Sequence, residues 1–84
     1  MSEIGDNETV VEQHRAYLLG ERTLWRHLNG HEYEVICVAR CDDLEVDMVI
    51  HRGVHDGRIW ARSKDNFLGK KGSSHRFVYL GDAE

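Results

Sequence analysis

Apolar and polar residues alternate in short runs along most of the chain between residues 24 and 80. A period of two is typical of strands that bury one face. Between these runs lie Asn29-Gly30 and Asp56-Gly57, which predict hairpin turns. Asn and Gly together suit a tight type I′ turn, because both central residues need a positive φ. The pattern predicts five strands, at 24–28, 32–40, 45–52, 58–62 and 76–80.

A different pattern precedes the strands. Thr9 and Glu12 have the spacing of a capping box, in which each side chain accepts a hydrogen bond from the other residue's backbone N–H. Apolar residues then recur at helical spacing, and Gly20 is a suitable stop. We therefore expect a helix at 9–19, after an acidic tail at 1–8. It is too short to be stable alone, so it must pack on its own domain or on a second chain. Its apolar face consists of Val10, Val11, Tyr17 and Leu18.

Five short strands with tight turns indicate a small antiparallel barrel. Segment 63–68 is turn-like, and 69–74 is a loop rich in Gly, Lys and Ser. We predict a mainly β, small α+β fold: a strongly bent, five-stranded Src-homology-3-like barrel at 24–80, preceded by the helix and followed by a tail at 81–84. Helix and barrel form a single domain at 9–80. The expected core comprises Val35, Cys37, Ala39, Met48, Ile50, Ile59, Phe67, Phe77 and Tyr79.

Composition narrows the class of protein. A chain of 84 residues has room for one domain. The net charge of −4 comes from acidic residues near the two ends, while the body is near neutral. This balance disfavours nonspecific nucleic-acid binding, although a local basic patch remains compatible with it. No apolar run approaches the roughly 20 residues of a membrane span, and no signal peptide opens the chain. Cys37 and Cys41 are too far apart on one strand for an easy disulfide, so we expect a cytoplasmic protein.

Two kinds of chemistry are disfavoured. The histidines at 27 and 31, and at 51 and 55, have i, i+4 spacing, but that spacing chelates a metal on a helix and these pairs fall on strands and turns. We interpret them as surface histidines. Cys37 lies in the most apolar strand, where a buried thiol is inert. The sequence has no glycine-rich phosphate loop and no nucleophile elbow. We expect no metal, no cofactor and no catalytic residue.

Basic residues concentrate between 60 and 80, where Asp65 is the only acid. Arg62 and Arg76 fall on strands that we expect to be near neighbours, and Trp60 lies beside them. Guanidinium groups next to an aromatic face can hold a phosphate through two parallel hydrogen bonds and stack a base. The candidate ligand-binding residues are Arg62, Arg76, Trp60, Arg40, Arg26 and Lys64. The alternative is structural: Trp60 belongs to the core, and Arg62 pairs with Glu32, Glu34 or Glu45.

Four short pieces occur in order: Arg26-His27 before Gly30 and Tyr33-Glu34-Val35, then Val38-Ala39-Arg40, then Trp60-Ala61-Arg62 with Phe67-Leu68, and finally Arg76-Phe77. Through these pieces, residues 24–80 resemble the small bacterial and phage domains grouped as domain-of-unknown-function family 1653. The resemblance implies a small β domain and supplies no reaction or ligand. The chain differs from the family pattern at His51, where a tyrosine is usual, at Ser63, where a proline often follows the arginine, and at Asp42-Asp43, where a Ser/Glu pair is common.

Two functions from different classes follow. The first is a non-catalytic binding module for a phosphate-bearing ligand, either a nucleic-acid segment or a nucleotide-derived small molecule, which such binding could sequester. The second is a protein-interaction module or homodimeric adaptor that uses the face of the N-terminal helix. Neither requires a membrane.

Overall fold

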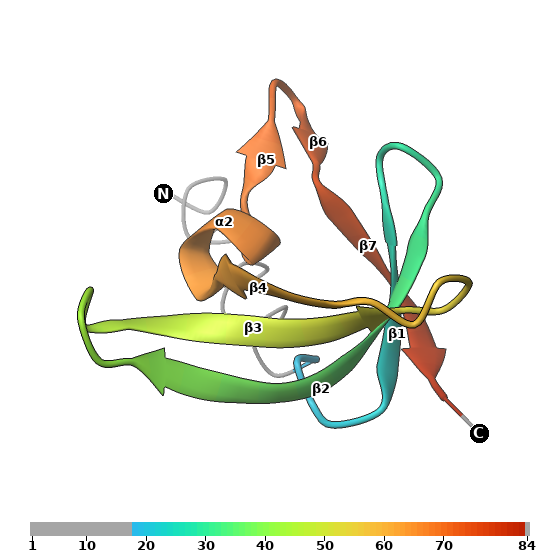
Figure 1. Ribbon diagram of the computed structural model, residues 1–84. Coiled ribbons are helices and arrows are strands. Elements are labelled where there is room, and N and C mark those ends of the chain that lie inside the picture. The colour runs from blue at the N-terminus through green and yellow to red at the C-terminus, as the bar shows by residue number, and fades with distance from the viewer. Residues whose placement is uncertain (1–17, 84) are drawn as a thin grey trace.

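The computed structural model describes residues 18–83. Five antiparallel strands form one sheet in the order β4-β3-β2-β1-β7, and two very short strands form a separate hairpin (Figure 1). Each predicted strand is confirmed to within two residues. The elements are β1 (Thr23–His27), β2 (Glu32–Cys41), β3 (Val46–Gly53), β4 (Ile59–Ser63), α2 (Lys64–Leu68), β5 (Lys70–Lys71), β6 (Ser74–His75) and β7 (Phe77–Asp82).

Both predicted hairpins form, but not with type I′ turns. Within the Asn29-Gly30 and Asp56-Gly57 pairs, only the glycine has a positive φ, 94° at Gly30 and 71° at Gly57. In the first hairpin the backbone N–H of Gly30 donates to the His27 carbonyl at 2.8 Å, and the His27 N–H donates to the carbonyl of His31 at 2.8 Å. This is a three-residue loop that ends in a left-handed glycine. Glycine adopts that conformation without steric cost. The predicted position of the turn is therefore confirmed, whereas the predicted turn type is wrong.

The sheet is open, which corrects the predicted closed barrel. Among residues 18–83, β4 pairs only with β3, and β7 pairs only with β1. The chain passes from β4 to β7 through α2 and the β5–β6 hairpin (Figure 1). Ser63 ends β4 and caps α2, because its hydroxyl accepts from the backbone N–H of Asn66 at 3.2 Å. The strand therefore turns into a helix before it can extend a ladder toward β7.

The predicted helix at 9–19 lies outside the described residues except for its last two. Leu18 is in a turn and Leu19 has no regular structure, so the helix does not extend to its predicted end. α2, with only five residues, was expected as a turn-like segment. The last strand runs to Asp82, two residues beyond its predicted end.

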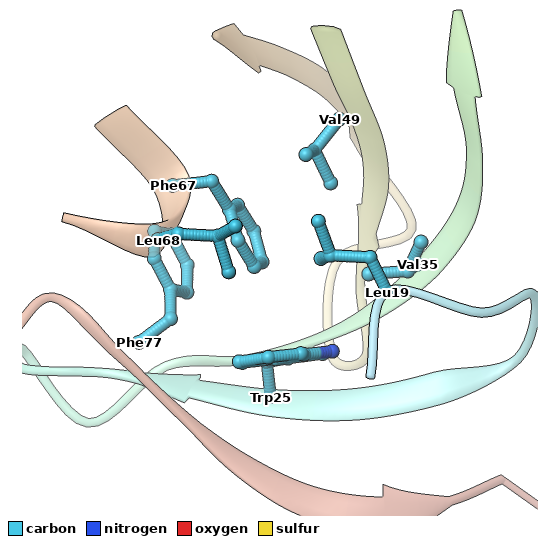
Figure 2. Close-up of a cluster of buried hydrophobic side chains, with 7 residues drawn as sticks. All are labelled: Leu19, Trp25, Val35, Val49, Phe67, Leu68 and Phe77. Atoms are coloured by element: carbon cyan, nitrogen blue, oxygen red, sulfur yellow. The ribbon is translucent and has the colours of Figure 1, made fainter. Parts of the chain in front are cut away.

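Seven apolar side chains form the core, with α2 contributing two of them above the concave face of the sheet (Figure 2). The predicted Val35, Phe67 and Phe77 are confirmed as buried, and Met48, Ile50 and Tyr79 are half-buried. Cys37, Ala39 and Ile59 are exposed, Ile59 by 62%, so these three predictions are wrong. The cluster comprises Leu19, Trp25, Val35, Val49, Phe67, Leu68 and Phe77.

A β-bulge explains the error in β2. Val35 pairs with His51, but Cys37 pairs with Ile50, so Ile36 is an extra residue. One extra residue moves every later side chain to the opposite face. The positions that alternation placed inside, Cys37 and Ala39, therefore point outward.

Candidate ligand-binding pocket

A pocket of about 250 Å³ lies on the concave side of the sheet. Its walls come from β1, the following turn, β2, β3, β4 and β7. The register assembles it, because directly opposed residues of antiparallel strands project to the same face. His27 is opposite Phe77, and His51 is opposite Trp60. The lining residues are His27, Asn29, Tyr33, His51, Trp60, Ala61, Arg62 and Phe77.

Phe77 lies at the junction of the pocket and the core. It stacks on Phe67 with ring centroids 3.9 Å apart and an interplanar angle of 9°. Three further rings meet it edge-on: His27 at 4.8 Å, His51 at 5.8 Å and Tyr33 at 5.9 Å. Edge-to-face contacts at 4.5–7 Å are favourable for aromatic rings. The pocket wall is therefore a packed aromatic cluster with few alternative arrangements.

Arg62 places a positive charge in this wall. Its guanidinium carbon lies 5.3 Å from the centroid of the Phe77 ring, a cation–π arrangement. Its Nη1 donates to the side-chain oxygen of Asn66. Arg76 uses the same residue, because its Nη1 donates to the backbone carbonyl of Asn66 at 3.3 Å. Asn66 in α2 thus holds both arginines.

Neither of these two arginines has a carboxylate within ion-pair distance in the described part of the chain. The carboxylate of Glu34 instead meets Arg52 at 3.0 Å and Arg22 at 3.9 Å. The structural alternative for Arg62, a pair with a glutamate, is therefore not found among residues 18–83. Trp60 is 46% exposed and does not belong to the core.

Two histidines of the pocket have pKa values below the ordinary range. Burial is the largest cause for His51, and the charges of Arg62 and His27 lower the pKa further, against a hydrogen bond with the Val49 carbonyl that raises it. Burial also lowers the pKa of His27, followed by the charge of Arg62. A histidine titrates near 6.5 without such effects, so both rings are neutral at pH 7.

The structure brings together three of the six predicted site residues. Trp60 and Arg62 line the pocket, and Arg76 joins Arg62 through Asn66. Arg26 follows the buried Trp25 on β1 and so lies on the outer face of the sheet.

Arg40 and Lys64 line a second hollow, of about 410 Å³. Three carboxylates share it, and one of them, Asp47, meets Arg40 at 3.2 Å. This second hollow is poorly suited to an anion, because the carboxylates would repel it.

Sequence reasoning missed the histidines, Tyr33 and Asn29. The prediction that His51 is a surface histidine is wrong, because its side chain is only 3% exposed. A two-residue turn at Asp56-Gly57 would pair His55 with Arg58 and so place His51 opposite Arg62, whereas the structure places His51 opposite Trp60. The cross-strand partner of Trp60 depends on the length of this loop, which the predicted turn does not give.

The described residues contain no group of three or more His, Cys, Asp or Glu side chains arranged to hold a metal ion. None of their helices has the length and apolar character needed to cross a bilayer.

The fold and the pocket together define a small antiparallel β-sheet domain with a hollow of about 250 Å³ on its concave face. The chain belongs to the family described as "protein of unknown function (DUF1653)", whose family model matches residues 23–79, more than half of the chain. The resemblance seen in the sequence is thereby confirmed. No curated protein and no solved structure matches the chain.

Proposed function

We propose that this domain is a non-catalytic binding module for a small phosphate-bearing ligand, held in the pocket beside Trp60 and Arg62. The observation that carries the proposal is the position of Arg62: its guanidinium lines the pocket, rests over Phe77 and is oriented by Asn66. Its partners in the described residues are neutral, so an arriving phosphate does not have to displace a carboxylate.

The orientation of Arg62 before a ligand arrives favours the affinity for that ligand. A guanidinium fork makes two aligned, charge-assisted hydrogen bonds with a phosphate, and a fork already fixed loses less side-chain entropy on binding. Arg76 lies on the other side of Asn66 and adds positive charge nearby. Lys71 and Arg76 both lower the pKa of His27, so their charges reach the pocket.

The size of the pocket favours a small molecule over a nucleic-acid segment. A volume of about 250 Å³ lies just below the roughly 300–1,000 Å³ typical of drug-sized ligand sites. It holds one ring with a neighbouring group rather than several nucleotides. The net charge of −4 also disfavours a long polyanion. We therefore favour a nucleotide-derived small molecule, which binding without turnover would sequester.

Binding without chemistry agrees with the state of the pocket histidines. Nδ1 of His51 engages the Val49 carbonyl, and Nδ1 of His27 engages the backbone N–H of Asn29. General-base activation of a nucleophile needs a histidine oriented by a third group toward that nucleophile. Among residues 18–83, neither histidine is part of such an arrangement of nucleophile, histidine and orienting group.

The finer statements about fold and location belong to the same proposal. We propose an open relative of the Src-homology-3-like barrel. The relation is supported by the meander of β1 to β4, which a short helix follows before β7 returns to pair with β1. The two free thiols support a cytoplasmic location. The alternative function, a protein-interaction module or homodimer built on the helix face, stays a prediction, because Val10, Val11 and Tyr17 lie outside the described residues.

Isothermal titration calorimetry tests the proposal with inorganic phosphate, ribose 5-phosphate and the 5′-monophosphates of adenosine, guanosine, cytidine and uridine. For the tightest of these, Arg62→Gln should lower affinity about tenfold to a hundredfold, as expected for the loss of about 1.5–3 kcal/mol. Arg26→Gln is the matched control, because it removes the same group from the outer face. Lys71→Gln, in the exposed hairpin, should have a small effect that disappears between 50 and 200 mM salt.

Equal losses from Arg62→Gln and Arg26→Gln would leave only a diffuse electrostatic attraction and contradict the pocket. No binding of any phosphate compound would contradict the proposal altogether.

A further inference from the structure

The backbone fixes which nitrogen of His51 carries the hydrogen. Nδ1 lies 3.0 Å from the Val49 carbonyl oxygen. A carbonyl only accepts, so Nδ1 must donate, and in the neutral ring Nε2 is then an acceptor without a hydrogen. The residue lines the pocket although it is only 3% exposed, and because Nδ1 is engaged by the Val49 carbonyl, Nε2 is the ring nitrogen left for a ligand. His51 thus presents a hydrogen-bond acceptor to the pocket.

His27 has the opposite tautomer. The backbone N–H of Asn29 donates to its Nδ1 at 3.1 Å. An N–H only donates, so Nδ1 has no hydrogen, and in the neutral ring Nε2 carries it. His27 also lines the pocket and meets the same Phe77 ring as His51. One pocket therefore holds a fixed donor and a fixed acceptor on two rings that both contact Phe77.

The surroundings keep both rings neutral. The charge of Arg62 on β4 lowers the pKa of both histidines, and the charge of His27 lowers the pKa of His51. Tyr33 on β2 packs against His51 at 5.1 Å, while Lys71 and Arg76 act on His27. Among the residues that the structure describes, no carboxylate lowers or raises the pKa of either histidine. A protonated His51 would have no acceptor left, so neutrality preserves the contrast between the two rings.

A phosphate alone does not match this arrangement. An ionised phosphate is rich in acceptors, so it can receive hydrogen bonds from Arg62 and from Nε2 of His27, but it would oppose the lone pair of His51 Nε2. The group next to His51 must instead donate. The Watson–Crick edge of a nucleobase carries an N–H beside a ring nitrogen or carbonyl acceptor, so it can satisfy both histidines at once. Trp60, 46% exposed in the same pocket, offers a face on which a base can stack.

We propose that the pocket recognises the base of its ligand by an edge that pairs a donor with an acceptor, His51 Nε2 accepting and His27 Nε2–H donating, while the phosphate lies toward Arg62. The ligand class is then a mononucleotide or a compound with the same planar edge. This inference rests on the proposed function, since it assigns the remaining part of the phosphate-bearing ligand.

Calorimetry at pH 7.5 separates the two proposals. At least one of the four nucleoside 5′-monophosphates should bind tenfold or more tightly than ribose 5-phosphate. Replacing every hydrogen of that donor by methyl, through dimethylation of the amino group of adenine or cytosine or methylation of the ring N–H of guanine or uracil, should remove the advantage. If ribose 5-phosphate binds as tightly as every nucleotide, base recognition is overturned and phosphate binding survives. If no compound binds, both proposals fail.

A variant tests the acceptor directly. His51→Phe keeps a ring against Tyr33, Phe67 and Phe77 but has no Nε2. It should bind the preferred nucleotide no better than ribose 5-phosphate, with the affinity for ribose 5-phosphate unchanged. His55→Phe makes the same change at an exposed residue outside the pocket and should leave the preference intact. An unchanged base preference in His51→Phe would overturn the inference.

A measurement on the unmodified protein covers the case in which His51→Phe does not fold. Long-range ¹H–¹⁵N correlation spectra at pH 7.5 report which ring nitrogen carries hydrogen. The inference requires hydrogen on Nδ1 of His51 and on Nε2 of His27. The reverse tautomer at either residue would overturn it.

Discussion

At the scale of single residues, Phe77 couples stability to binding. One contact of its ring is the stack on Phe67 in the core, and another is the guanidinium of Arg62 in the pocket wall. The side chain is only 1% exposed, so it cannot move without disturbing both. Changes in the core beneath the pocket should therefore reach the ligand.

Truncation of Phe67 tests this packing. Phe67→Ala should destabilise the domain by about 3–5 kcal/mol, because the cavity beneath Phe77 has few neighbours able to fill it. Chemical denaturation monitored by tryptophan fluorescence measures the free energy of unfolding, with the more conservative Phe67→Leu as the control. A cooperatively folded Phe67→Ala protein with a near-normal melting temperature would contradict the assignment of Phe67 to the core.

The two pocket histidines predict the direction of a pH effect on stability. Their pKa values are lowered in the folded state, so between the unfolded value near 6.5 and the folded value the unfolded chain binds more protons. Stability should be fully present above about pH 6.5 and decline as the pH falls below it, by at most about 1.4 kcal/mol per pH unit for each histidine. Urea denaturation between pH 7.5 and 5.5 measures this slope, and His51→Phe should flatten it. A slope unaltered by that substitution would mean that His51 is not held neutral.

At the scale of elements, the five residues of α2 contribute to the fold and to the pocket in three ways. It contributes Phe67 and Leu68 to the core, it orients both arginines through Asn66, and it turns the chain away from β4. Its start depends on Ser63, whose hydroxyl accepts from the N–H of Asn66. Asn66 therefore takes part both in the N-cap of α2 and in the hydrogen bonds that orient the two arginines.

Removing the cap should affect both stability and binding. Ser63→Ala is expected to cost about 1 kcal/mol of stability, the typical worth of a serine N-cap. It should also weaken phosphate binding, since Asn66 loses a restraint. Thermal denaturation and calorimetry measure the two effects, and Ser73→Ala in the exposed β5–β6 turn is the control. Weakened stability with unchanged affinity would show that Asn66 does not orient Arg62.

The strands could be predicted from the sequence because Gly30 and Gly57 mark the turns and the runs between them alternate. The buried face of β2 could not, because the bulge at Ile36 has no signature in the alternation. α2 is shorter than two helical turns, too short for a helical period to appear. In the candidate site, the concentration of basic residues between 60 and 80 pointed to Arg62 and to the neighbouring Trp60. The histidines required knowledge of which strands pair, which is a property of the sheet.

At the scale of the whole molecule, the open sheet is what makes the pocket. β4 does not pair with β7 in the described chain, so Arg62 on β4 contacts Phe77 on β7 through its side chain rather than through a ladder of hydrogen bonds, and Trp60 lines the hollow with them. A closed barrel would fill that space with paired backbone. The correction to the predicted fold and the location of the candidate site are thus the same structural fact.

The most direct test of this account is a ¹H–¹⁵N chemical-shift titration with the mononucleotide that binds most tightly in the calorimetric panel. The account predicts that the largest changes fall on the Trp60 indole, Arg62, His27 and Phe77. The outer face, with Arg26 and Val78, should remain unchanged. Changes centred on the outer face, or on the second hollow with Arg40 and Lys64, would contradict it.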